Sequence, residues 1–255
     1  WSSVRFSSTT STTTIKMLSC LTKPTGGDAI VGGYNIIRES EKVKHLIGVS
    51  PQETAIAPGL SAKENLELMC GVHGFPKDKR KEKIAELTAL LGLESVIGKK
   101  AGKLSGGWQR RLSIAMALIS EPRILFLDEP TSGLDPATAD EIQKMILAEK
   151  EKGKTVFLTT HTMSEAEKLC DHISLLNEGH IIEYGAPDEI CRRYNHKKKI
   201  TIHLTDGTDL QIPQNEAAAD TVARLLRSGK AETIHTTEPN LEAVFMELTG
   251  KELEK

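Results

Sequence analysis

The sequence predicts an α/β fold built on a parallel sheet, with a helical subdomain and a small C-terminal α+β unit. Short continuous apolar runs occupy residues 124–127, 155–160 and 173–176, as in strands that are buried on both faces. Helical stretches such as 141–150 separate these runs, which predicts crossover helices between parallel strands. Residues 60–119 have a helical pattern throughout, which predicts the subdomain.

Composition excludes several classes of protein. The 255 residues contain 33 Lys and Arg against 35 Asp and Glu, a net charge of -2, which argues against nucleic-acid binding by charge alone. No apolar run approaches the roughly 20 residues that cross a bilayer. The four cysteines form no C-x-x-C pair, so we expect reduced thiols.

The elements before residue 60 are short. Residues 1–14 show no helical or strand period, whereas the apolar spacing in 15–21 predicts a helix that includes Leu21 on its apolar face. A short strand or a hairpin is expected over 28–36, and a strand over 46–52 ends at a proline.

Local patterns mark the helices of the subdomain. Ser61 and Glu64 form a capping box at the start of one helix. A second helix carries three apolar residues on one face, and its charged stretch 77–83 is expected to be solvated. The three are Ile84, Leu87 and Leu91.

The C-terminal part begins with a hairpin of 173–176 with 180–184, followed by a helix that Pro187 opens. Beyond it, alternating apolar residues over 200–212 surround an Asp-Gly turn, which predicts a second hairpin. A helix, a strand and a last helix follow. We expect 199–255 to form a small accessory domain.

Two adjacent carboxylates carry the clearest chemistry. The buried strand 124–127 delivers Asp128 and Glu129 at its carboxyl end, the edge where open α/β sheets bind ligands. One carboxylate on Mg²⁺ and a second that deprotonates a water suit the hydrolysis of a phosphoanhydride.

A second motif, Leu-Ser-Gly-Gly at 104–107, precedes a helix with apolar residues on one face. Ser105 is expected to cap this helix, and Gly106 and Gly107 leave backbone N–H groups uncovered at its positive end. Such an end binds phosphate oxygens.

Together these motifs resemble the ATP-binding cassette family, the ATPase subunits of ABC transporters. In order they are Gln52 after a strand, the signature 104–107, the carboxylate strand 124–130, 132–135, and His161 after a strand. The resemblance covers about 12–190, and 200–255 resembles the C-terminal extension of bacterial subunits from drug-export and polysaccharide-export systems.

The resemblance implies catalytic and metal-binding roles. Glu129 would be the general base, and His161 would hold the γ-phosphate. Gln52 would contact Mg²⁺ and the attacking water, while Asp128 binds Mg²⁺ through water. Thr12 would place its hydroxyl on Mg²⁺.

It also implies contacts with ATP. Thr12 and Thr13 would lie at the end of the phosphate-binding loop. The signature residues Ser105, Gly106 and Gly107 would contact a nucleotide held mainly by an opposite subunit. Asp135 would belong to the loop that couples the two sites.

The implied fold is a P-loop NTPase-type parallel sheet over 12–195, with the helical subdomain at about 60–120. Two cassettes would sandwich two ATP molecules and drive transmembrane permease subunits. The second ATPase subunit is either identical or different. No nucleic acid is implied, and the location would be cytoplasmic, peripheral to the inner face of the cell membrane.

The sequence departs from the family at the phosphate-binding loop, G-x-x-x-x-G-K-[ST]. Ser11 stands in place of the lysine and Thr10 in place of the preceding glycine, so the loop cannot wrap the phosphates. Residues 1–14 are thus unmatched or degenerate, and we favour a truncated or frame-shifted start over true degeneracy. We expect this chain to bind and hydrolyse ATP poorly by itself.

Two other functions stay open. One is a non-hydrolytic cassette that contributes only its signature to a competent partner in a heterodimer. The other is an ABC protein of translation or chromosome maintenance, which would carry two cassettes or a long coiled-coil insertion.

Overall fold

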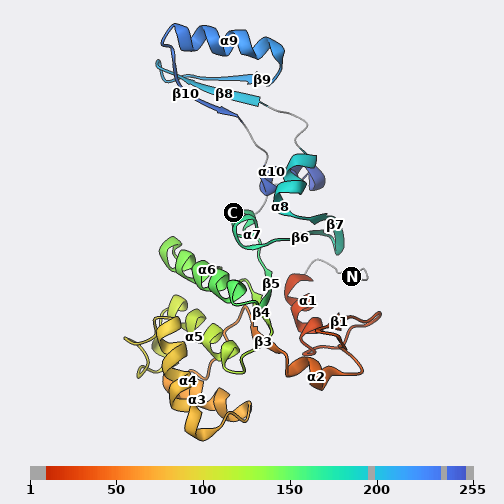
Figure 1. The fold of residues 1–255 in the computed structure, drawn as a ribbon, viewed down its shortest axis with the longest axis vertical. Coiled ribbons are helices and arrows are strands. Elements are labelled where there is room, and N and C mark those ends of the chain that lie inside the picture. The colour runs from red at the N-terminus through yellow and green to blue at the C-terminus, as the bar shows by residue number, and fades with distance from the viewer. Residues whose placement is uncertain (1–9, 195–198, 237–239, 251–255) are drawn as a thin grey trace. The chain divides into compact units, whose positions relative to one another are not determined.

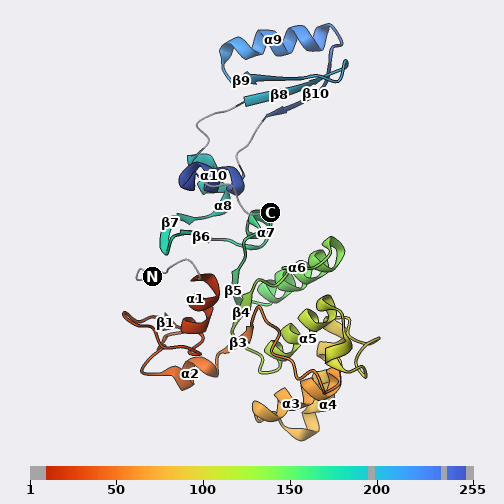
Figure 2. The same cartoon turned by 180° about the vertical axis from the view of Figure 1, so that it is seen from behind.

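The computed structural model describes residues 10–194, 199–236 and 240–250. They divide into two compact units, Trp1–His161 with Glu178–His180, and Thr162–Asn177 with Ile181–Lys255. Figures 1 and 2 label their helices and strands.

A three-stranded parallel sheet forms the centre of the first unit. Its order is β3 (Ile47–Ser50), β4 (Ile124–Asp128) and β5 (Thr155–Thr159). The register places Ile47 beside Ile124 and Asp128 beside Thr159. The predicted α/β fold with a parallel sheet is therefore confirmed for these strands.

The central strand β4 is buried on both faces. Phe126 packs with Ile15 of α1 (Thr10–Leu18) and lies 5.5 Å from the ring of Phe157. Leu125 and Leu127, which point to the other face because side chains alternate along a strand, are fully buried. Figures 1 and 2 show α1 on one side of the sheet, and α5 (Gly106–Leu118) and α6 (Pro136–Glu151) on the other.

Helix α1 differs from its prediction at both ends. It begins at Thr10, within the stretch where no period was expected, because Ile15 is buried against the sheet and the threonines continue the same helix. It ends at Leu18, and Leu21 is 64% exposed. Placing Leu21 on the buried face was therefore wrong.

Of the two possibilities for 28–36 the structure has the hairpin, and the predicted strand before residue 60 is confirmed. Strands β1 (Ile30–Val31) and β2 (Tyr34–Asn35) pair antiparallel, and the short helix α2 (Ser40–Lys44) follows. Val31 and Val43 join the cluster around Phe126. This segment thus covers the same face as α1.

The helical segment contains α3 (Ala62–Val72), α4 (Lys77–Leu90) and a 3-10 turn, η1 (Ala101–Lys103). The predicted capping box is present: Ser61 Oγ accepts from the Glu64 backbone N–H at 3.2 Å, and Glu64 accepts from the Ser61 N–H at 2.7 Å. Ile84, Leu87 and Leu91 are buried, as the spacing predicts.

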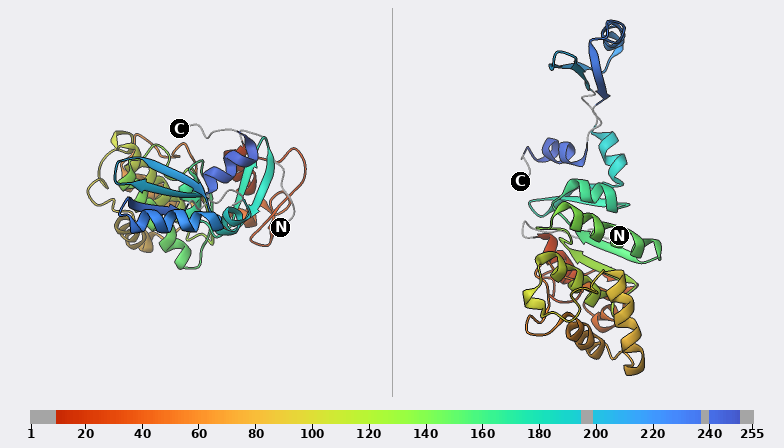
Figure 3. Two further views of the ribbon diagram at one scale, coloured as in Figure 1. Left: turned by 90° about the horizontal axis from the view of Figure 1, so that it is seen from above. Right: turned by 90° about the vertical axis from the view of Figure 1, so that its left-hand side faces the viewer.

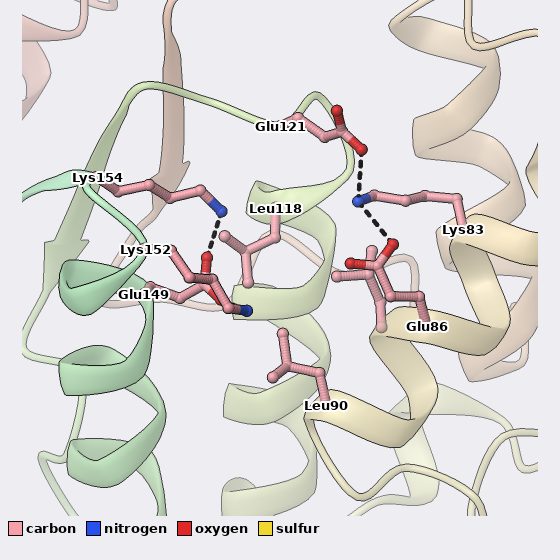
Figure 4. A pocket seen from close by; sticks show the side chains of 9 residues that line it. Lys83, Glu86, Leu90, Leu118, Glu121, Glu149, Lys152 and Lys154 are labelled. Atoms are coloured by element: carbon pink, nitrogen blue, oxygen red, sulfur yellow. Dashed lines mark hydrogen bonds and ion pairs between the residues drawn. The ribbon is translucent and has the colours of Figure 1, made fainter.

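Charged side chains surround a cavity of about 210 Å³ at the ends of α4, α5 and α6 (Figure 4). Lys83 donates to Glu86 at 3.0 Å and to Glu121 at 2.8 Å. Its side chain is buried, so the prediction that 77–83 is entirely a solvated face was wrong there. Ion pairs with Glu86 on the same helix and with Glu121 outside it make this burial tolerable.

The second unit contains α7 (Met163–Leu169), β6 (Ile173–Asn177), β7 (His180–Gly185) and α8 (Pro187–Arg193). Strands β6 and β7 pair with each other, as predicted for this hairpin, and Pro187 opens α8. The expectation that 173–176 is buried on both faces in the parallel sheet was wrong, because β6 belongs to a two-stranded sheet with β7 and its Ser174 is exposed.

A three-stranded antiparallel sheet follows, in the order β10-β8-β9. Its strands are β8 (Lys199–Leu204), β9 (Asp209–Pro213) and β10 (Ala231–Thr236). Ile202 on the central strand is fully buried, and α9 (Glu216–Arg227) lies alongside the sheet (Figure 3). The predicted hairpin, helix and strand are confirmed.

The last helix, α10 (Leu241–Thr249), packs on α7 and α8 through Leu241 and Val244. Its first backbone N–H, that of Leu241, donates to Glu167 Oε1 at 2.6 Å. The chain thus returns to α7 after the small sheet. The accessory domain over 199–255 stays a prediction.

All four cysteines are free, and Cys70 is buried. Within the described residues, every helix is too short or too polar to cross a bilayer.

Gly48 allows α5 to approach β3 closely. A Cβ at this position would lie 2.2 Å from the Ala117 carbonyl oxygen. We expect Gly48→Ala to lower the free energy of unfolding by about 1–3 kcal/mol, measured by urea denaturation. Gly71→Ala is the control, because a Cβ there meets nothing within 4 Å and should stabilise α3 by about 0.5–1 kcal/mol. Equal effects of both substitutions would contradict this explanation.

Glu149 makes stability depend on pH. Burial raises the pKa of this carboxyl, but hydrogen bonds from Lys152 and Lys154 outweigh burial and lower the pKa overall. A carboxyl with a lowered pKa in the folded state stabilises above its unfolded pKa, and this contribution disappears as the pH falls through its folded pKa. We expect Glu149→Gln to cost about 1–3 kcal/mol at neutral pH and progressively less in acid.

Urea denaturation at several pH values measures this dependence. The matched control is Glu151→Gln on the exposed side of the same helix. If Glu149→Gln lowered the free energy of unfolding by the same amount at neutral and at acid pH, the predicted pH dependence would be contradicted.

Candidate active site

The carboxylates of Asp128 and Glu129 are held at the carboxyl ends of β4 and β5. Asp128 is 1% exposed, and its Oδ1 accepts from Thr159 Oγ1 at 2.6 Å. This bond follows from the register, which pairs Asp128 with Thr159 across the two strands. It leaves Oδ2 for another ligand, and carboxylate oxygens are what Mg²⁺ prefers.

Glu129 adopts a left-handed backbone conformation, with φ of 50°. Such a conformation is uncommon for a residue with a side chain and is retained where surrounding contacts determine it. Here the Glu129 N–H donates to the Thr159 carbonyl oxygen at 3.1 Å and lies 3.3 Å from Thr159 Oγ1. Because of this turn, the Glu129 side chain leaves the backbone in a different direction from the Asp128 side chain.

His161 lies against Glu129. Its Nδ1 is 2.8 Å from Glu129 Oε2, and the ring is 64% exposed whereas the carboxylate is nearly buried. The contact orients the carboxylate and leaves the second ring nitrogen, Nε2, for another partner. The structure thus brings Asp128, Glu129 and His161 together around Thr159.

Gln52 follows β3 and is exposed. Its backbone carbonyl accepts from Arg110 Nη2 at 2.8 Å. Arg110 belongs to none of the motifs in the sequence, and the one local signal is its place before the apolar run 112–119 on the same helix.

The signature residues begin α5. Ser105 occupies the position before the helix, but its side chain makes no capping hydrogen bond, so the prediction that its hydroxyl caps α5 was wrong. A Cβ at Gly107 would lie 2.9 Å from Thr138 Cγ2, whereas one at Gly106 would meet nothing within 4 Å. Packing therefore explains Gly107 but not Gly106.

Asp135 caps α6. Its carboxylate accepts from the Thr138 N–H at 3.0 Å and from Thr138 Oγ1 at 2.7 Å. These two hydrogen bonds lower the pKa of Asp135. Through Thr138, the starts of α5 and α6 are therefore neighbours, and Asp135 is already engaged within this chain.

Thr12 and Thr13 lie in the first turn of α1, Thr12 half-buried and Thr13 exposed. The rest of the expected phosphate-binding segment, residues 1–9, lies outside the described residues. Within those described, no group of three or more His, Cys, Asp or Glu side chains is arranged to hold a metal. Carboxylate and hydroxyl oxygens at Asp128 and Thr12 nevertheless have the chemistry that suits Mg²⁺ in the presence of phosphate ligands.

Thr159 should stabilise the fold through Asp128. Thr159→Val keeps the shape of the side chain but leaves the buried Asp128 carboxylate without this donor, so we expect a loss of about 1–3 kcal/mol in the free energy of unfolding. Thr155→Val, at the exposed start of the same strand, should change it by less than about 0.5 kcal/mol. Chemical denaturation compares the two, and similar losses would argue against the hydrogen bond.

Comparison with known proteins finds relatives in sequence and in fold. The sequence model described as "ABC transporter" matches residues 11–132, and one described as an AAA domain matches 100–166. The Linearmycin resistance ATP-binding protein LnrL of Bacillus subtilis (strain 168) is 34% identical, over 94% of this chain and 86% of that protein.

The Fluoroquinolones export ATP-binding protein of Mycobacterium tuberculosis (strain CDC 1551 / Oshkosh) is 35% identical, over 94% of this chain and 80% of that protein. A dimeric structure of the ATP-binding cassette MJ0796 in a post-hydrolysis state, bound to ADP and Pi, superposes with a TM-score of 0.62 at 29% identity. It covers 68% of this chain and 79% of the other. The chain belongs to the ABC transporter family, as one of its ATP-binding subunits.

Proposed function

We propose that the chain is the ATP-hydrolysing subunit of an export-type ABC transporter. The observation that carries the proposal is the cluster of Asp128, Glu129 and His161 at the ends of β4 and β5. Export is suggested by relatives named for drug resistance and drug export that cover nearly the whole chain. The partners of this chain would be transmembrane permease subunits.

The residues divide the chemistry among them. Glu129 deprotonates the water that attacks the γ-phosphate, and His161, in contact with Glu129, donates to a phosphate oxygen. Asp128, Gln52 and Thr12 would hold Mg²⁺, which neutralises charge on the phosphates. Each of these residues supplies oxygen, the ligand atom that suits this metal.

Two copies, or this chain and a different cassette, would close over two ATP molecules. Gly106 supports this arrangement, because its missing side chain has no explanation in the packing of the chain itself. Backbone N–H groups at the start of α5 would then approach a nucleotide on the opposite subunit. Closing on ATP and opening after hydrolysis would move the permease.

Glu129→Gln tests the hydrolytic role. We expect the ATPase rate in Mg²⁺ and ATP to fall by about 10²- to 10⁴-fold, since the general base is removed, while binding of a fluorescent ATP analogue is retained. Glu151→Gln, far along α6, is the control. A variant that hydrolyses ATP at the rate of the original chain would contradict the assignment.

Thr10 and Ser11 occupy the positions of the glycine and the lysine in the phosphate-binding loop. This predicts a low ATPase rate for the chain with its present sequence. Restoring a glycine-lysine loop before Thr12 should raise the rate, because lysine and uncovered N–H groups bind the β- and γ-phosphates. Equal turnover by both proteins would contradict this.

The alternative is a non-hydrolytic cassette that lends its signature to a partner. The start of α5 supports this alternative, because it is exposed and has no side-chain cap, as a signature offered to a partner would be. Mixed with a cassette that carries a glycine-lysine loop, such a chain would support ATPase activity that Gly106→Val abolishes and Glu129→Gln leaves unchanged. Loss with both variants would support hydrolysis by this chain.

A further inference from the structure

Arg110 is a charged side chain in the interior of α5. Its residue is 6% exposed, and the helix continues from Leu112 to Leu118 as an unbroken buried run. Removing a charge from water costs several kcal/mol unless partners replace the water. A side chain in this position therefore requires specific acceptors.

The acceptors are two consecutive carbonyl groups in the loop after β3. Arg110 Nη1 donates to the Pro51 carbonyl oxygen at 2.7 Å, and Nη2 donates to that of Gln52 at 2.8 Å. Both are short charge-assisted hydrogen bonds, and the planar guanidinium fixes two acceptors in one orientation. Arg110 thus determines where the backbone of Gln52 lies relative to α5.

The same guanidinium lies within electrostatic reach of the carboxylates. Burial lowers the pKa of Arg110, and the negative charges of Asp128 and Glu129 oppose this effect. Arginine remains protonated in proteins, so a positive charge that is hydrogen-bonded to the Gln52 loop also interacts electrostatically with the two carboxylates. One side chain therefore connects three of the residues assigned to hydrolysis.

We propose that Arg110 is a positioning residue of the ATP site, which holds the Gln52 loop in register with Asp128 and Glu129 and ties that register to the helix that begins with the signature. The proposal rests on the proposed function. Displacement of α5 moves the guanidinium, and with it the Gln52 backbone. Contact of the signature with a nucleotide is thereby transmitted to the loop that places the water and metal.

Arg111 provides the matched control. It follows Arg110 on the same helix, donates to the Leu91 carbonyl oxygen at 3.2 Å and forms an ion pair with Glu141. It thus anchors α5 to the helical segment and to α6. Its loss should reduce stability without changing the Gln52 loop.

Hydrogen exchange tests the contact without any dependence on hydrolysis. In Arg110→Met we expect peptides covering 51–57 to exchange at least about 10-fold faster than in the original chain, while Arg111→Met leaves them unchanged. Arg110→Lys keeps one charged donor and should be intermediate. If circular dichroism shows that Arg110→Met does not fold, Arg110→Lys takes its place in this comparison. Unchanged exchange in the Arg110 variants would overturn the proposal.

Kinetics test the consequence for the site. On the chain with a restored phosphate loop, we expect Arg110→Met to lower kcat by about 10- to 100-fold through displacement of Gln52, with KM for ATP changed by less than about 3-fold. The loss of kcat from Arg110→Met should not add to that from Gln52→Ala, whereas any smaller effect of Arg111→Met on kcat should add to it.

The two arms separate the hypotheses. Altered exchange in a chain that hydrolyses no ATP, even with its loop restored, would contradict the proposed function and leave the contact established. Additive losses from Arg110→Met and Gln52→Ala in an active protein would overturn the positioning role alone.

Discussion

The parallel pairing of β4 with β5 determines the geometry of the candidate site. It places Thr159 beside Asp128, so that one hydroxyl donates to a carboxylate that is nearly excluded from water. The same threonine receives the Glu129 N–H on its carbonyl oxygen, which fixes the left-handed turn. His161, two residues further along, then reaches Glu129. A shift of one residue in this register would separate Asp128 and Glu129 from Thr159 and His161.

Close packing also fixes the position of α5 against β3. Because Gly48 has no side chain, the helix approaches β3 until a Cβ would touch the Ala117 carbonyl oxygen. A hydrogen bond of 2.9 Å links the hydroxyls of Ser50 and Ser113 across the same contact. Arg110 donates to the Gln52 carbonyl oxygen in the loop after β3. The distance between α5 and the sheet therefore decides whether the guanidinium can hold the Gln52 backbone.

Local patterns predicted the elements, and long-range contacts decided what the patterns missed. Apolar runs predicted β3, β4 and β5, and the Ser61–Glu64 pair predicted the start of α3, because these signals lie within a few residues. Lys83 and Arg110 are buried through partners 38 and 58 or 59 residues away, which no local period reveals. Helix α1 extends to Thr10 in a threonine run, since its stability comes from Ile15 against Phe126.

At the start of α5, some residues have a role in packing or capping and others have none. Gly107 is required by Thr138, and Asp135 is engaged as the cap of α6. Ser105 leaves its hydroxyl out of the cap, and Gly106 faces open space. A glycine in the first turn of a helix costs backbone entropy, and Gly106 contributes no packing in return. The chemistry of these two residues, a free hydroxyl and uncovered N–H groups at a positive helix end, is what an anionic ligand requires. The parts of the signature that the fold leaves unused are therefore those that the proposed nucleotide contact assigns to ATP.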